Sequence, residues 1–75
     1  MIIDQLQFPA SNDFETRISW AGERVCDIAE GLISREAGEW IVTLVIGWSD
    51  LGTEEERANY REMARQIREV LQAAA

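Results

Sequence analysis

The run from Trp40 to Trp48 constrains the fold most strongly, because an extended chain here would be apolar on both faces. Alternate residues of the run fall into two sets, Trp40, Val42, Leu44, Ile46 and Trp48 on one face and Ile41, Thr43 and Val45 on the other. Nine residues are few for a helix, and β-branched residues favour strands. A short run that is apolar on both faces is typical of a central strand. We therefore expect residues 39–48 to lie inside a sheet.

Three further segments are predicted to complete this sheet, at residues 2–8, 14–20 and 23–34. Residues 14–20 alternate between apolar and polar side chains, as a half-buried strand does. Ala-Gly-Glu at residues 21–23 and again at 37–39 predicts hairpin turns, since glycine accepts a positive φ. Residues 23–34 also fit an amphipathic helix. The strand, with a bulge at Gly31, is the favoured interpretation, and the helix stays open as the alternative.

The C-terminal part of the chain predicts one long helix over residues 53–73. Thr53 and Glu56 have the spacing of a capping box, in which each side chain bonds the other residue's backbone N–H. The residues behind them form an apolar stripe with helical spacing, namely Tyr60, Met63, Ala64, Ile67, Val70 and Leu71. Residues 1–75 are thus predicted to be a single α+β domain. Its fold would be a four-stranded antiparallel β-meander with one C-terminal α-helix packed on one face.

The charge of the chain is strongly negative and unevenly distributed. The net charge is −7, and residues 1–56 carry twelve of the fourteen carboxylates but only three of the seven arginines. Such acidity disfavours direct binding to nucleic acid or anionic membranes and favours a basic protein partner. The remaining arginines, Arg57, Arg61, Arg65 and Arg68, are predicted to pair with carboxylates at the sheet edge. No apolar run approaches the ~18 residues of a membrane span.

The residue types disfavour catalysis. The chain has no histidine and no lysine, and Cys26 is its one cysteine. Without histidine, neither Cys26 nor the serines have an obvious activating base, and a zinc site lacks ligands. We therefore expect no enzyme activity, no catalytic residue, no metal and no cofactor. Cys26 is predicted to be a small buried apolar residue, and a lone cysteine fits the reducing cytoplasm of a bacterial host.

The carboxylates of the predicted strands and turns are the candidate partner-binding residues. They are Asp13, Glu15, Glu23, Asp27, Glu30, Glu36, Glu39 and Asp50. Residues on one strand face repeat at ~6.7 Å, close to the about 7 Å between successive phosphates of a DNA strand, so such a row could mimic DNA. Ordinary solubility charge is the competing explanation. It does not explain why the acids avoid residues 57–75.

In size, charge and the meander-plus-helix order that ends in Thr53-Glu54-Glu55-Glu56, the chain resembles the small acidic anti-CRISPR proteins of phages. The resemblance implies binding to a CRISPR surveillance complex and obstruction of its DNA recognition. No contact residue can be carried over, because these proteins share no motif. Two alternatives stay open: an antitoxin or immunity protein that neutralises a basic toxin, and a homodimeric structural protein that uses the open sheet face. The chain could accordingly act as a monomer or a homodimer.

Overall fold

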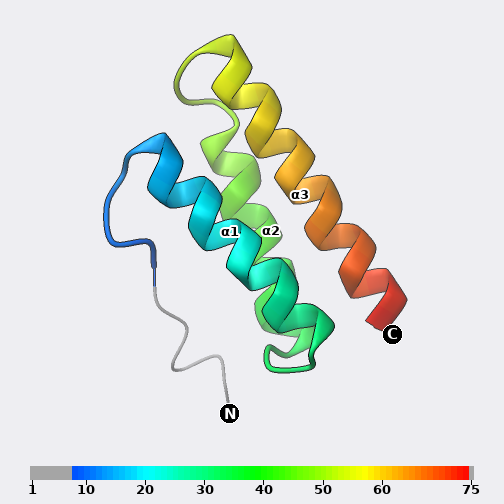
Figure 1. Cartoon of the computed structure of the whole chain (residues 1–75). Helices are drawn as coiled ribbons and strands as arrows, with labels where there is room; N and C mark the ends of the chain where they lie inside the picture. The colour runs from blue at the N-terminus through cyan, green and yellow to red at the C-terminus, as the bar shows by residue number, and fades with distance from the viewer. Residues whose placement is uncertain (1–7, 75) are drawn as a thin grey trace.

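The computed structural model describes residues 8–74, and these residues form three helices. They are α1 (Phe14–Ala29), α2 (Arg35–Trp48) and α3 (Glu54–Ala74). Helices α1 and α3 run in the same direction and α2 runs against them, and α3 packs along both of the others (Figure 1). No strand occurs within residues 8–74, so the predicted α+β meander is wrong. The strand expected at residues 2–8 lies outside the described residues except for Phe8.

Helix α1 replaces the strand predicted at residues 14–20 and most of the one predicted at 23–34. Asp13 caps its first turn by accepting a hydrogen bond from the Thr16 backbone N–H at 3.1 Å. Gly31, with φ 78°, ends it, and the backbone N–H of Leu32 bonds the Asp27 carbonyl as in a Schellman motif. The core-facing residues step by four and three, at Phe14, Ile18, Ala21, Val25 and Ile28. Gly22 therefore lies inside a helix and Gly31 is no bulge.

Helix α2 occupies the segment that was expected to be the central strand. Ser34 caps it by accepting a hydrogen bond from the Ala37 N–H at 3.2 Å. Ile41 and Val45 are both 0 % exposed and lie in the core, so the apolar run serves helix packing instead of two sheet faces. The predicted turn at residues 37–39 is also wrong, because these residues lie within α2. An open sheet face containing these residues, and a homodimer built on it, are excluded.

Helix α3 confirms the predicted helix over residues 53–73. The Thr53 hydroxyl accepts a hydrogen bond from the Glu56 N–H at 3.1 Å, and the Glu56 carboxylate accepts one from the Thr53 N–H at 3.0 Å. This is the predicted capping box. Residues of the predicted stripe are buried at Tyr60, Ala64, Ile67 and Leu71 and partly buried at Met63 and Val70. At the other end, the Arg35 guanidinium donates to the Leu71 carbonyl oxygen at 3.1 Å, which ties α2 to α3.

A chain of aromatic rings joins all three helices at one end of the bundle. Phe14 of α1 packs edge-on against Tyr60 of α3, with ring centroids 5.3 Å apart. Trp48 of α2 lies 5.8 Å from Tyr60 and 5.8 Å from Trp20 of α1. Edge-on pairs of this kind add to the burial of large apolar area. The arrangement fixes α1 against α2 although these two helices touch over a shorter length than either touches α3.

Candidate functional site

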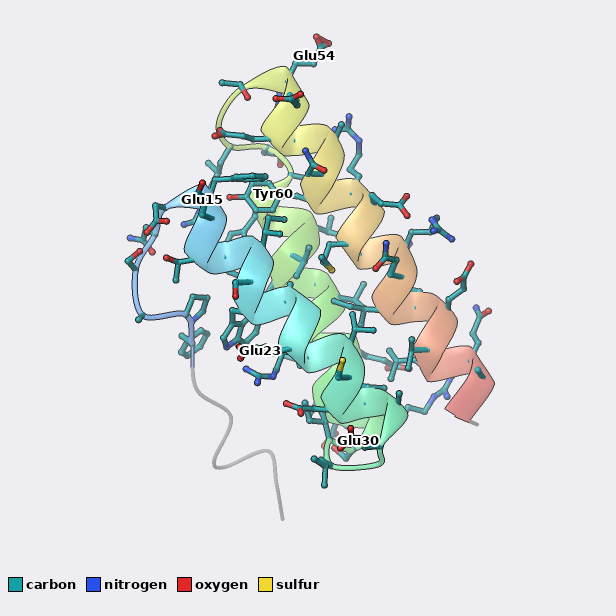
Figure 2. All side chains as sticks on the ribbon, viewed as in Figure 1. Glu15, Glu23, Glu30, Glu54 and Tyr60 are labelled. Atoms are coloured by element: carbon teal, nitrogen blue, oxygen red, sulfur yellow. The ribbon has the colours of Figure 1, made fainter. Side chains whose placement is uncertain are left out.

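Three glutamates line the outward side of α1, and we call Glu15, Glu23 and Glu30 the α1 acidic face. All three are exposed, and Figure 2 shows them spread along the length of the helix. They are separated by eight and seven residues, close to two helical turns each, so they share one side. At about 1.5 Å per residue the steps are roughly 12 and 10.5 Å. The outward side of α1 is therefore a rod of negative charge.

The two arginines of α1 are turned towards the core, and of the three glutamates only Glu23 is ion-paired with one of them among the described residues. The Arg17 guanidinium lies 5.0 Å from the centre of the Trp48 ring, and that of Arg24 lies 5.3 Å from the Trp20 ring. Arg24 also donates to Asp27 at 2.8 Å, and only 17 % of its side chain is exposed. Such cation–π contacts hold the positive charge against the aromatic rings. On the outward side, only Glu23 keeps an arginine nearby, with Arg24 at 3.5 Å.

Glu30 has an unusual position at the C-terminal end of α1, where it is the C-cap residue. The helix dipole makes this end partly negative, so a carboxylate is destabilised here by about 0.3–1 kcal/mol. No basic residue lies in the last turn of α1 to compensate it. Glu15, by contrast, lies in the first turn, where the dipole favours it. Helix stability explains Glu15 but not Glu30.

Two of the predicted partner-binding residues have structural tasks in α1. Asp13 is the N-cap, and the hydrogen bond from the Thr16 N–H lowers the pKa of its carboxyl below 3.8. Asp27 is half-buried and paired with Arg24. These two carboxylates are thus less available to a partner than the α1 acidic face.

The remaining predicted residues lie away from α1. Glu36 is exposed in the first turn of α2, and no ion pair involves it within the described residues. Glu39, one turn further along, lies 3.4 Å from Arg35. Asp50 is exposed in the turn between α2 and α3. The structure therefore divides the eight predicted carboxylates among three places and does not gather them into one site.

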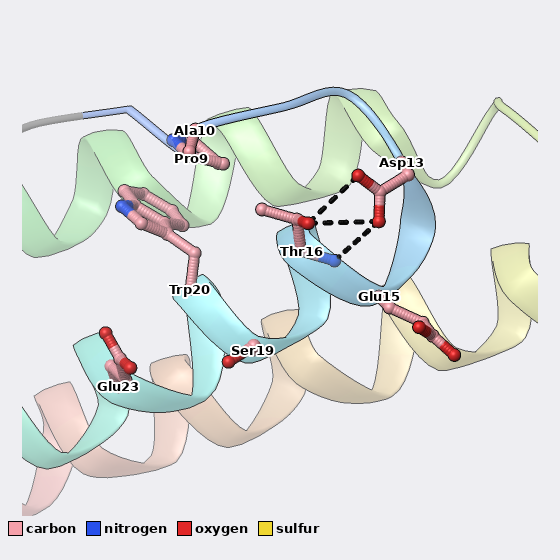
Figure 3. Close-up of a pocket in the computed structure, with 8 residues that line it drawn as sticks. All are labelled: Pro9, Ala10, Asp13, Glu15, Thr16, Ser19, Trp20 and Glu23. Carbon is pink, nitrogen blue, oxygen red and sulfur yellow. Dashed lines mark hydrogen bonds between the residues drawn. The ribbon is translucent and has the colours of Figure 1, made fainter.

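A depression of about 400 Å³ opens beside the α1 acidic face, between α1 and the chain segment that leads into it (Figure 3). Its lining residues are Pro9, Ala10, Asp13, Glu15, Thr16, Ser19, Trp20 and Glu23. Trp20 is buried and its ring already contacts the Arg24 guanidinium, so the exposed carboxylates of Glu15 and Glu23 are the groups here that suit a cationic side chain of a partner. Within residues 8–74, no group of three or more carboxylate or thiol side chains could hold a metal ion. The depression can therefore recognise charge and shape.

Sequence reasoning missed the position of Cys26 and of the arginines of α3. Cys26 is exposed on α1 between Glu23 and Glu30, so its predicted burial is wrong. It falls outside the core-facing steps of α1, which would have indicated exposure once a helix was assumed. Arg65 pairs within its own helix, with Glu62 and Glu69, and the first of these pairs lowers the pKa of Glu62 to about 2. Arg61 and Arg68 are exposed. The prediction that these arginines bind a sheet edge is therefore wrong, because Arg65 pairs within α3 and Arg61 and Arg68 face solvent.

The part of the chain that the structure describes contains no helix long and apolar enough to cross a membrane. Comparison of the chain with protein-family models, with curated proteins and with solved structures finds no match.

Proposed function

We propose that this protein is a non-enzymatic inhibitor whose α1 acidic face occupies a basic, nucleic-acid-binding surface of another protein. One observation carries the proposal: along α1 the glutamates face outward while Arg17 and Arg24 lie against tryptophan rings. A helix whose charges served only solubility would not need this separation, because mixed charges on its outward side would serve equally well. The separation leaves a row of exposed glutamates that a basic groove can accept in place of a nucleic-acid backbone.

The helix changes how such mimicry works. The expected match between strand spacing and phosphate spacing no longer applies, since the acids follow one another at roughly 12 and 10.5 Å along a helix. This is longer than the phosphate spacing of about 7 Å, so the face does not copy single phosphates. It competes with nucleic acid through its field, which attracts a basic groove at long range and is screened by salt. Binding should therefore be fast and sensitive to ionic strength.

The class of partner follows from this field. A CRISPR surveillance complex, with its basic DNA-binding channel, is the partner that the resemblance to anti-CRISPR proteins suggests. A basic toxin, neutralised by an antitoxin or immunity protein, would engage the same face. The exposed thiol of Cys26 suits a reducing compartment, so we place either interaction in the cytoplasm of a bacterial host. The identity of the captured protein separates the two possibilities.

The test is capture of partners from a bacterial lysate on the immobilised full chain. We expect the bound proteins to be basic, and to be released by about 0.5 M salt or by added duplex DNA. A variant with Glu15→Gln, Glu23→Gln and Glu30→Gln should lose them. The matched control carries the same charge change on α3, as Glu54→Gln, Glu55→Gln and Glu69→Gln, and should retain them. Circular dichroism would verify that both variants are helical.

Three results would contradict the proposal. The first is retention of the bound proteins by the α1 variant at the level of the wild-type chain. The second is binding that neither salt nor duplex DNA displaces, since a field-driven contact must weaken in both conditions. Equal loss in both variants would also count against it, because net charge and not the α1 acidic face would then govern binding.

A further inference from the structure

The outward side of α2 carries an apolar surface that the described residues leave largely uncovered. Trp40 is 43 % exposed and Ile46 is 38 % exposed. A shallow depression of about 310 Å³ lies on this side, and Trp40, Thr43, Leu44, Gly47 and Trp48 line it. We call it the α2 depression. A helix that is apolar on all sides is usually buried on all sides. Here the core explains only one side of α2.

Gly47 leaves the floor of the α2 depression open. A Cβ atom built on Gly47 would meet no atom within 4 Å, and Gly47 is not among the glycines with positive φ. Gly47 lies in the last turn of α2, one residue before its end, and no close contact or positive φ requires a glycine there. Gly38 differs, since its missing Cβ makes room for the Leu71 side chain. What Gly47 provides is space at the surface.

The charges around the α2 depression indicate what occupies that space. Glu36 lies one turn before Trp40 on the same side of α2 and has no ion pair among the described residues. Glu39 lies one turn before Thr43, is exposed, and lies 3.4 Å from Arg35. Phe8 packs edge-on against Trp40 at 5.3 Å, while Pro9 lines the depression beside Glu23, so the two depressions lie on either side of residues 8–9. A second copy of the chain, with net charge −7, would bring like charges together at this surface. A basic segment would bring opposite ones.

We propose that the α2 depression receives an aliphatic side chain from a basic amphipathic helix of the partner, whose arginines or lysines face Glu36 and Glu39. The inference rests on the proposed function, because it places an apolar anchor beside the charged contact. The volume is at the lower end of the roughly 300–1,000 Å³ of ligand pockets, and the site is open. This suits one side chain of a helix better than a free small molecule. The Thr43 hydroxyl donates to the Glu39 carbonyl at 3.2 Å, so its polar atom is already satisfied.

The test uses two synthetic helical peptides of equal charge. One has leucines on a single helical face and arginines elsewhere, and in the other the leucines are replaced by serines. We expect the full chain to bind the Leu/Arg peptide about tenfold more tightly than the Ser/Arg peptide in 0.15 M salt, as the burial of an aliphatic side chain requires. Gly47→Leu fills the depression and should abolish this difference. Ala58→Leu, an exposed change on α3, is the matched control and should preserve it.

Several outcomes would overturn the inference. One is equal affinity of the wild-type chain for the two peptides, and another is a Gly47→Leu variant that still prefers the Leu/Arg peptide. A wild-type dimer that Gly47→Leu converts to a monomer would assign the surface to a second copy of the chain. An Ile3→Ser and Leu6→Ser variant that binds the Leu/Arg peptide tenfold more tightly would assign it to the chain's own first residues. The variant that lacks the α1 acidic face should bind both peptides more weakly while keeping the preference for leucine. Failure of the apolar anchor is thus distinguishable from failure of the proposed function.

Discussion

The glycines of α1 and α2 provide a sharp test of how the helices pack. Gly22 lies inside α1 and Gly38 in the first turns of α2, and the change to alanine adds the same methyl group at each. Alanine is favoured over glycine in a helix interior by about 1 kcal/mol. A Cβ at Gly22 meets no atom within 4 Å, whereas at Gly38 it would lie 2.5 Å from Leu71 Cδ2 and 3.3 Å from Leu71 Cγ. The two substitutions should therefore differ in sign.

The size of the difference follows from the position of Leu71. Carbon atoms in contact prefer about 3.5–4.0 Å, so the Leu71 methyl group must move by roughly 1 Å. Leu71 is only 5 % exposed, so the surrounding core atoms resist this movement of its side chain. Overpacking typically costs 1–3 kcal/mol. The gain in helix propensity, about 1 kcal/mol, offsets part of this cost. Gly38→Ala should therefore lower the free energy of unfolding by up to about 2 kcal/mol. Gly22→Ala should raise it by about 1 kcal/mol.

Urea unfolding, followed by circular dichroism at 222 nm, measures both changes. A double-mutant cycle with Leu71→Ala isolates the contact, because this change removes the atoms that the new methyl group would meet. In the Leu71→Ala background, Gly38→Ala should become stabilising by about 1 kcal/mol. The reasoning is refuted if Gly38→Ala stabilises the wild-type chain as much as Gly22→Ala does, or if Leu71→Ala leaves its effect unchanged.

Two further predictions concern single carboxylates of α1. Glu30→Gln should raise the free energy of unfolding by about 0.3–1 kcal/mol, because it removes a negative charge from the negative end of the helix. The same urea titration measures this change, and a loss of stability would contradict the role of the helix dipole. Asp13→Ala should lower the melting temperature at pH 7. The folded state lowers the pKa of Asp13 below 3.8, so its contribution is present above that pH and is lost as the pH falls through the folded-state value. The gap between the two melting temperatures should therefore close in acid, and a gap that is constant down to pH 2 would show that ionisation of Asp13 plays no part.

Helix α3 could be predicted from the sequence because its signals agree. Its capping box, its uninterrupted stripe and its acidic first turn all indicate the same helix with nearly the same bounds. Helix α1 also carried such signals, in the N-cap Asp13 and the core-facing steps from Phe14 to Ile28. The pair Ala21-Gly22, interpreted as a turn, divided that stripe and made its first half resemble a strand. Glycine inside a helix is unfavourable, but here tertiary packing outweighs it.

Helix α2 could not be predicted in the same way, because its helical stripe is hidden. Ile41, Val45 and Trp48 have helical spacing, but the residues between them are also largely apolar and β-branched. Packing against α1 and α3 overrides that β-propensity. The candidate carboxylates were identified from the sequence, yet their grouping was not. Side chains on one side repeat about every 2 residues along a strand and about every 3.6 residues along a helix, so the secondary structure decides which carboxylates share a side. Only the helix brings Glu15, Glu23 and Glu30 together.

The features that weaken the isolated chain lie on α1 and α2 and not on α3. Glu30 lies at the unfavourable end of α1, Gly47 lies in the last turn of α2 without any close contact, and Trp40 is 43 % exposed. Helix α3 has instead the capping box and the ion pairs of Arg65. A domain of 75 residues has a thin stability margin, so each of these departures is costly to the isolated chain. Departures from local consistency are typical of functional surfaces. The proposed partner would remove two of these penalties, by neutralising Glu30 and by covering Trp40.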